Sequence, residues 1–213
     1  TWLLGAVNKL TKNNRSIDIQ NDMKIFRLTI YDGEMPDNEI NWFTLPDSTV
    51  IRTDNPFFVP DFDTVFKASF TLAVKIGRLG KSIAPRFAHR YYAEATIAVT
   101  AHAANLLDNL KRRGLPWDRA VSFDRCCMVG DFLPIEEILS QETTFAPSRT
   151  SCCGIKPSVS DIDRIISLIS RDNTLKIGDL ILIPLAGESI VLAPGQEIKA
   201  DCDSKNILEI RVR

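Results

Sequence analysis

The most regular pattern of hydrophobic and polar positions runs from residue 68 to residue 76, where large apolar side chains alternate with small or polar ones. One set is Phe70, Leu72, Val74 and Ile76, and the other is Ser69, Thr71, Ala73 and Lys75. Successive side chains of a strand point to opposite faces of the sheet. The alternation therefore predicts a strand with one core face and one small, polar face.

Several other segments have the pattern of a strand or of an amphipathic helix. Strands are predicted at 23–31 and 96–100, and in the tail at 179–184, 189–193, 197–202 and 206–212, where turn residues separate them. Helices are predicted at 85–93, 102–113 and 161–170, the last with Ser160 as its N-cap and a stripe of isoleucines. Because strands outnumber helices and do not alternate with them, we expect an α+β fold in which β-structure dominates.

The length of 213 residues fits one large domain, or one domain with a small appendage, at roughly 150 residues per domain. We expect residues 1–22 to be an N-terminal extension and residues 23–213 to form the domain. The apolar opening at residues 2–7 is too short for a membrane span or a signal peptide. We therefore expect a cytoplasmic protein without membrane association.

The net charge of the chain argues against nucleic acid as a partner. Lys and Arg number 26 and Asp and Glu 27, so the net charge of -1 produces no long-range field that would attract nucleic acid.

The five cysteines are Cys126, Cys127, Cys152, Cys153 and Cys202. Their spacing is that of neither a zinc site nor a disulfide framework, so we expect reduced, mostly buried thiols. A disulfide or an unusual metal site remains the alternative.

Four blocks of sequence carry a resemblance to a known family. They are KASFTLAVKIGRLGKSI at 67–83, RYYAEATIAV at 90–99, GLPWDRAVSFD at 114–124 followed by Gly130, and IISLISRDNTLKIGDLI at 165–181. In order and spacing they resemble the fumarylacetoacetate hydrolase family, over about residues 23–213. The resemblance implies a mixed β roll with a few packing helices. It also implies a homodimer that binds Mg²⁺ or Mn²⁺ and cleaves, decarboxylates or isomerises 2-oxo acids and diketones.

The positions that bind the metal in that family differ here. The family's Glu-x-Glu pair and its later Asp align with Ser69, Thr71 and Thr100. All three are neutral hydroxyls, whereas Mg²⁺ is bound mainly by carboxylates. We therefore expect no metal cofactor, and an uncharged, vestigial pocket lined by Ser69, Thr71, Thr100 and His102.

Other functional positions of the family also differ. Two lysines align with Leu45 and Val121, the N-terminal catalytic histidine is missing, and the TGTPAG loop reads IPLAG at 183–187. The main hypothesis is therefore a catalytically degenerate relative that acts by binding, with a small 2-oxo acid as a possible ligand. The alternative is an active hydrolase, decarboxylase or isomerase with a relocated site, and a third hypothesis is a structural subunit that pairs with an active paralogue.

The candidate residues for a relocated site are few. His102 lies two positions after Thr100, so a continued strand would bring both to the same face. It is a candidate base or metal ligand, although a histidine that caps a helix or fills a pocket is more common. Asp61 and Asp63 could supply carboxylates, although aspartates in such a loop usually stabilise turns. We expect His89 to be structural or on the surface. Glu136 and Glu137 are adjacent and cannot easily converge on one substrate, and Asp161 and Asp163 lie in the first turn of a predicted helix, where acidic residues favour the helix dipole.

Overall fold

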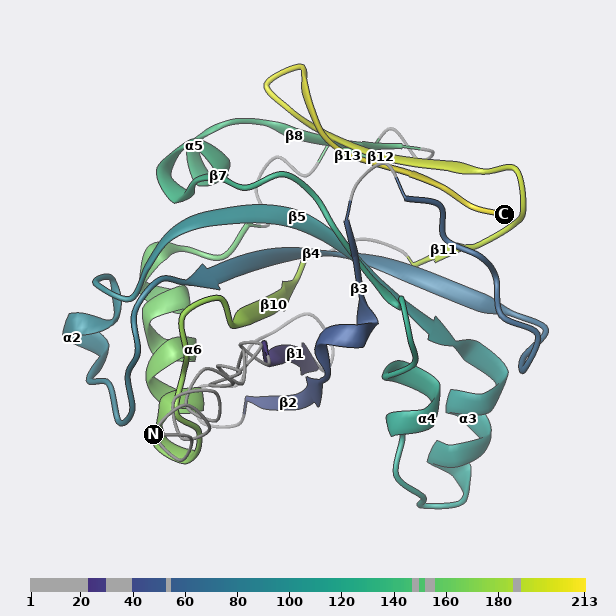
Figure 1. Cartoon of the computed structure of the whole chain (residues 1–213), viewed down its shortest axis with the longest axis horizontal. Coiled ribbons are helices and arrows are strands. Elements are labelled where there is room, and N and C mark those ends of the chain that lie inside the picture. The colour runs from purple at the N-terminus through teal and green to yellow at the C-terminus, as the bar shows by residue number, and fades with distance from the viewer. Residues whose placement is uncertain (1–22, 30–39, 53–54, 147–149, 152–155, 186–188) are drawn as a thin grey trace, which may run out of the picture.

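In the computed structural model of the protein, a long antiparallel pair of strands lies at the centre (Figure 1). The structure describes residues 23–29, 40–52, 55–146, 150–151, 156–185 and 189–213. Strands β4 (Phe66–Ile76) and β5 (Tyr92–Ala103) pair along almost their whole length. The polar and apolar faces predicted for 68–76 are those of β4. Leu72, Val74 and Ile76 are buried in the main core, and Ser69 and Thr71 lie on the other face.

The larger sheet is mixed and curls into a half-barrel, in the order β2-β1-β10-β4-β5-β6-β3. Its remaining members are β1 (Ile25–Thr29), β2 (Asn41–Leu45), β3 (Val50–Arg52), β6 (Cys127–Val129) and β10 (Leu180–Pro184), with β7 (Leu133–Pro134) paired to β5 and β11 (Ile190–Val191) paired to β4. The pairs β1–β10 and β3–β6 are parallel. The predicted α+β class with dominant β-structure, and the mixed β roll, are confirmed.

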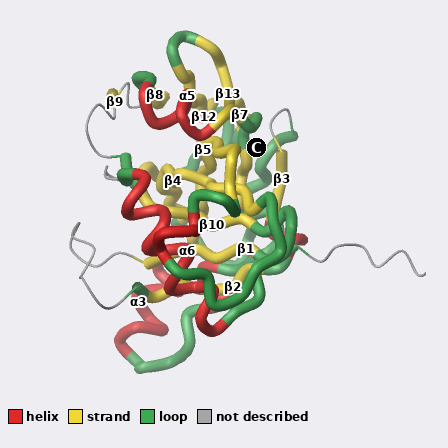
Figure 2. The backbone as a smooth tube through the Cα atoms, turned by 90° about the vertical axis from the view of Figure 1, so that its left-hand side faces the viewer, coloured by secondary structure: helices red, strands yellow, loops and turns green. Residues whose placement is uncertain are grey.

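The second sheet has four strands and covers the other side of β4 and β5. It contains β8 (Thr143–Ala146), β9 (Thr150–Ser151), β12 (Glu197–Cys202) and β13 (Lys205–Arg211). Figures 1 and 2 show β8, β12 and β13 on one side of β4–β5, and β1 with β2 on the opposite side. Phe70 of β4 stacks on Phe145 of β8, with ring centroids 4.1 Å apart. This contact joins the two sheets.

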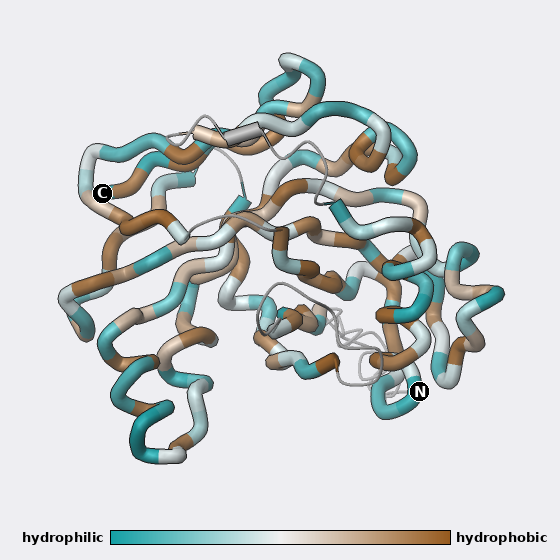
Figure 3. Tube along the Cα trace, turned by 180° about the vertical axis from the view of Figure 1, so that it is seen from behind, coloured by the Kyte–Doolittle hydropathy of each residue, from teal (hydrophilic) through white to brown (hydrophobic). Residues whose placement is uncertain are grey.

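Five α-helices are present in the described residues, with one short 3-10 helix at Asp47–Thr49. They are α2 (Pro85–Ala88), α3 (Ala104–Arg112), α4 (Asp118–Val121), α5 (Ile135–Ser140) and α6 (Val159–Asp172). The isoleucines of α6 are fully buried, as their spacing predicts. Figure 3 shows this segregation along the chain: apolar residues concentrate in the central strands, and turns and outer segments are polar. None of the described helices has the length and apolar character required to cross a membrane.

Three predicted element boundaries are wrong. The helix predicted at 85–93 ends at Ala88, because Tyr92 already pairs with Ile76 of β4. The helix predicted from residue 102 begins at Ala104, because His102 still pairs with Lys67 across the sheet. The N-cap of α6 is Ser158, which forms a capping box with Asp161, rather than Ser160. In the first two cases pairing with β4 prevails over local helix propensity.

Cys126, Cys127 and Cys202 are free and buried, in agreement with the reduced thiols predicted for them. Cys152 and Cys153 lie outside the described residues, as do the predicted extension at 1–22 and the end of the strand predicted at 23–31.

Candidate functional site

A cavity of about 360 Å³ lies on the inner face of the half-barrel, between the β4–β5 pair, β1 and the middle and end of α3. The cations, the imidazole and the hydroxyls of its lining belong to Arg27, Thr29, Ser69, Thr71, Thr100, His102 and Lys111. We call it the cationic pocket, because Arg27 and Lys111 line it and none of the described lining residues is a carboxylate. Its volume lies within the roughly 300–1,000 Å³ range of small-molecule sites.

The pairing of β4 with β5 brings the four sequence-predicted residues together. Ser69 lies directly opposite Thr100 in the register. Thr71 lies two residues from Ser69 on β4, and His102 lies two residues from Thr100 on β5, so each shares a face with its neighbour. All four side chains line the cationic pocket. His102 belongs to β5 rather than to the following helix, and this placement turns it inward.

The pocket hydroxyls do not fit the divalent metal that the resemblance implies. Thr71 and Thr100 are buried, and Thr71 Oγ1 donates a hydrogen bond to Ala98 O at 3.2 Å. Neutral hydroxyls do not repay the cost of removing water from Mg²⁺, and the Arg27 cation lines the same cavity. The described residues also include no group of three His, Cys, Asp or Glu side chains that could hold a metal ion. The described lining of this pocket therefore does not fit a divalent metal ion.

Sequence reasoning missed Arg27, one of the two cations that line the pocket. It lies on β1, on the same strand face as Ile25, and is half-buried. Its Nη1 donates to Ala101 O and to Val121 O, both at 3.1 Å. Burial lowers the pKa of Arg27 from its usual value, but an arginine remains protonated at neutral pH. The signal that could have identified it is an arginine between the core residues Phe26 and Leu28, on the opposite face of a predicted strand.

Among the described lining residues, His102 is the one imidazole. Burial, reinforced by the positive charges of Arg27, Lys67 and Lys111, lowers the pKa of His102 to about 4, although Asp108 acts in the opposite direction. The imidazole is therefore neutral at pH 7 and can accept a proton.

Aromatic side chains form one wall of the pocket beside Lys111. Lys111 Nζ lies 4.9 Å from the centroid of the Trp117 ring, and Trp117 packs against Phe43 at a centroid distance of 5.9 Å. Such a cation–π contact holds the ammonium in place at a modest gain. Lys111 is thereby positioned as a second cation at the pocket.

Asp63, a candidate for a relocated site, has a structural role at the N-terminus of α3. Its Oδ2 accepts a hydrogen bond from Leu106 N at 2.9 Å, and its Oδ1 accepts one from Asn105 Nδ2 at 2.9 Å. Partial burial would raise the pKa of Asp63, but the hydrogen bonds from Leu106, Val65, Asn105 and Thr64 outweigh it, and the pKa is lowered. The carboxylate thus caps α3 from a distant loop, and it is not among the pocket-lining residues.

Substituting Asp63 by alanine should lower the free energy of unfolding by about 1 kcal/mol at pH 7, the usual value of a lost helix cap. Because the folded-state pKa is lowered, this stabilisation is complete above the unfolded value of about 4 and is lost as the pH falls through the folded one. Urea unfolding at pH 7 and pH 3 measures both effects. Asp61→Ala is the control, since Asp61 is exposed. An unchanged stability at pH 7 would contradict the capping role.

The other carboxylates and His89 also have structural positions. Glu136 and Glu137 lie in the first turn of α5, and Asp161 completes the capping box of α6. Asp163 accepts a hydrogen bond from Tyr92 Oη at 3.0 Å and so joins α6 to β5. His89 is exposed at the end of α2. None of these side chains lines the cationic pocket.

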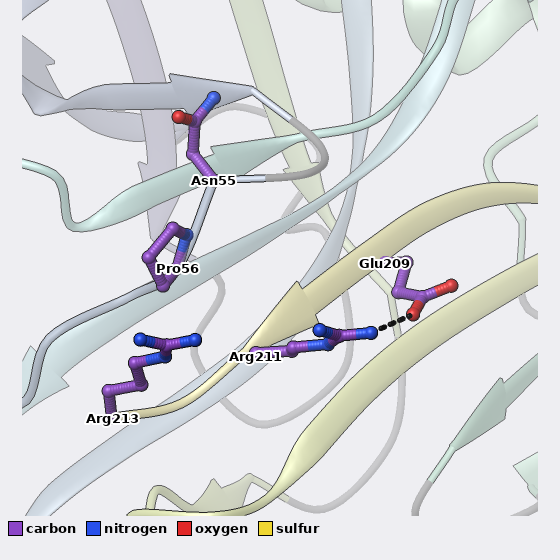
Figure 4. A pocket seen from close by; sticks show the side chains of 5 residues that line it. All are labelled: Asn55, Pro56, Glu209, Arg211 and Arg213. Carbon is purple, nitrogen blue, oxygen red and sulfur yellow. Dashed lines mark ion pairs between the residues drawn. The ribbon is translucent and has the colours of Figure 1, made fainter.

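A second hollow contains two further arginines and lies on the β13 side of the molecule. It is lined by Asn55, Pro56, Glu209, Arg211 and Arg213 (Figure 4). Its cavity is about 190 Å³, and Arg211 forms ion pairs with Glu209 and Glu197. Because carboxylates already offset Arg211 and no histidine is among the five lining residues, the cationic pocket is the stronger candidate for chemistry.

Comparison with known proteins gives a family match across most of the chain. The model described as fumarylacetoacetate (FAA) hydrolase C-terminal matches residues 19–213. The chain is 27% identical over 185 residues to the oxaloacetate tautomerase FAHD1, mitochondrial, of Rattus norvegicus, covering 80% of this chain and 79% of that protein. It is 26% identical over 172 residues to the oxaloacetate tautomerase YcgM of Escherichia coli, covering 78% of each.

A solved structure supports the same fold. The fumarylpyruvate hydrolase of Pseudomonas aeruginosa, determined in complex with Mn²⁺ and pyruvate, aligns with a TM-score of 0.74 at 16% identity. The alignment covers 90% of this chain and 89% of that one. At this identity the similarity concerns the fold, and the side chains in the pocket have to be judged individually.

Proposed function

Because the chain belongs to the fumarylacetoacetate hydrolase family, we propose that it is an enzyme of small 2-oxo acids, whose reaction is a proton transfer in the cationic pocket with His102 as general base. The observation that carries the proposal is one neutral imidazole beside two cations in a cavity of suitable size. The names of the relatives support an enzyme rather than the degenerate binding protein that was our main hypothesis.

The proposed reaction is a keto–enol tautomerisation. His102 removes a proton from the carbon beside the oxo group, and the electron pair of that C–H bond forms the new C=C bond. The electrons of the C=O π bond move to the oxo oxygen, which then receives the proton from the imidazolium, so no further reactant is needed. The lowered pKa keeps His102 unprotonated at neutral pH, which is the form that a general base needs.

The cations support the same reaction through electrostatics. A 2-oxo acid is an anion, and its transition state places additional negative charge on the oxo oxygen. Arg27 and Lys111 line the cavity with His102 and stabilise that charge. Their effect is largest if they are already in position before the reaction, because no reorganisation is then needed. Arg27 is held by two backbone carbonyls and Lys111 by the Trp117 ring.

The test is the rate at which the purified protein converts oxaloacetate between its enol and keto forms, followed by ultraviolet absorbance in buffer containing EDTA. A chelator is needed because divalent ions polarise the oxo group by themselves. We expect a rate proportional to protein concentration. Two further assays complete a panel of activities: release of CO₂ from oxaloacetate and hydrolysis of an acylpyruvate. Absence of turnover throughout the panel, in EDTA and in Mn²⁺, would overturn the proposal and favour a protein that acts by binding alone.

A further inference from the structure

The guanidinium of Arg27 is a cation on the inner face of the half-barrel that has no carboxylate partner in the described residues. Nη1 uses its two N–H groups on the carbonyls of Ala101 and Val121. The remaining donors, Nε–H and the two on Nη2, have no acceptor in the described part of the protein. A charge removed from water is costly unless it is paired and hydrogen-bonded. This arrangement leaves one edge of the guanidinium available to an anion.

The free edge has a defined shape. Nε–H and one Nη2–H are parallel and lie in one plane, which matches two oxygens of a carboxylate or of a carboxylate and the adjacent oxo group. The hydroxyls of Ser69 and Thr100 also line the cavity. They can donate to an anion without adding a competing negative charge. The pocket lining therefore favours a planar, oxygen-rich anion.

We infer that Arg27 is the permanent cation of this pocket and binds the carboxylate–oxo unit of the ligand directly, so that the site works without a divalent metal. The inference rests on the proposed function, because it concerns the same pocket and substrate class. The inferred site differs from the site that the family resemblance implies. Where that site would have carboxylates that hold a metal ion, the inferred site has a side-chain cation and three hydroxyls.

The charges of this pocket cannot favour both a bound divalent metal ion and a direct contact between Arg27 and an anion. A divalent cation needs anionic ligands nearby, whereas an unpaired guanidinium in the same cavity repels it. Lys111, and Lys67 opposite His102 in the sheet register, add positive charge around the same site. The lining that is unsuitable for a metal ion is therefore suitable for an anion.

Binding of oxalate to the full chain in EDTA tests the inference, because oxalate presents the planar oxygen pair and does not react. Isothermal titration calorimetry should detect binding without metal. Arg27→Met should weaken it by about 30-fold or more, as expected for removal of one member of a hydrogen-bonded charge pair. Arg27→Lys keeps the charge but not the paired donors, and we expect an intermediate loss. Arg211→Gln, which removes a guanidinium outside the pocket, should bind like the unmodified protein.

Two results would overturn the inference: no oxalate binding until Mn²⁺ is supplied, or unchanged binding by Arg27→Met. Circular dichroism and the thermal midpoint of each variant show whether it is folded, and Arg27→Lys provides a second reading if Arg27→Met is not. The inference and the proposed function fail separately. Oxalate binding that depends on Arg27 without turnover would refute the enzyme and retain the anion site, whereas turnover independent of Arg27 would do the reverse.

Discussion

Replacing His102 by alanine should lower kcat for 2-oxo acid tautomerisation by about 10²- to 10⁴-fold, the usual contribution of a general base. His102 is the one imidazole that lines the cationic pocket, and burial with three neighbouring cations keeps it neutral. No other described lining side chain can accept a proton at neutral pH, because the others are hydroxyls, cations and apolar groups. Loss of the imidazole should therefore remove the proton transfer and leave the cations in place.

The measurement is kcat and KM for oxaloacetate in EDTA, as a function of pH. With an intact His102, kcat/KM should be constant on the acid side down to about pH 5 and fall as the pH drops through about 4, where the imidazole becomes protonated. His89→Ala is the matched control, because the second histidine is exposed and outside the pocket. If His102→Ala kept full kcat, or lost activity only through a lower thermal midpoint, the assignment of the base would be wrong.

Replacing Gly130 by alanine should destabilise the protein by about 3 kcal/mol, at the upper end of the usual cost of overpacking. An added Cβ would lie 2.4 Å from Ile207 O and 3.0 Å from Ile97 O, and both are backbone atoms that cannot rotate away. Hydrogen bonds from Gly130 N to Ile97 O and from Asp131 N to Ile207 O hold this segment against β5 and β13. The close approach of three backbone segments requires glycine here.

The expected change is a thermal midpoint roughly 6–12 °C lower, since 1 kcal/mol corresponds to about 2–4 °C for a chain of this size. Gly77→Ala is the control, because its added Cβ would meet its nearest atom, Tyr91 O, at an ordinary 3.8 Å. Thermal unfolding followed by circular dichroism compares the two variants. Equal midpoints would show that the sheets can move apart at Gly130.

Strong local patterns predicted the central elements of the fold. The alternation at 68–76 defines both faces of β4, and the spacing of the isoleucines defines the buried side of α6. The patterns were weakest where a strand continues into a helical sequence. His102 and Ala103 look like the start of a helix, yet they remain in β5 because β4 offers them backbone partners. Partners far away in the sequence are invisible to a local pattern.

The same distinction applies to the cationic pocket. Ser69, Thr71, Thr100 and His102 were predicted together, because alternation along two paired strands places side chains on one face. Arg27 and Lys111 were not predicted, since they come from β1 and α3, 42 and 9 residues away from the nearest of those four. Curling of the sheet brings Arg27 across the barrel to the carbonyl of Ala101. Asp63 was a candidate ligand by sequence, and the start of α3 uses it as a cap instead.

The amino-acid sequence by itself determined the class of fold, the family resemblance and the replacement of carboxylates by hydroxyls at three pocket positions. These are properties of residue type and short-range periodicity, which are read directly along the chain. Only the tertiary structure decided the electrostatic sign of the pocket. The charge of a cavity depends on which distant side chains the folded sheet brings together. Here it brings Arg27 and Lys111 to His102, with no carboxylate among the lining residues that the structure describes.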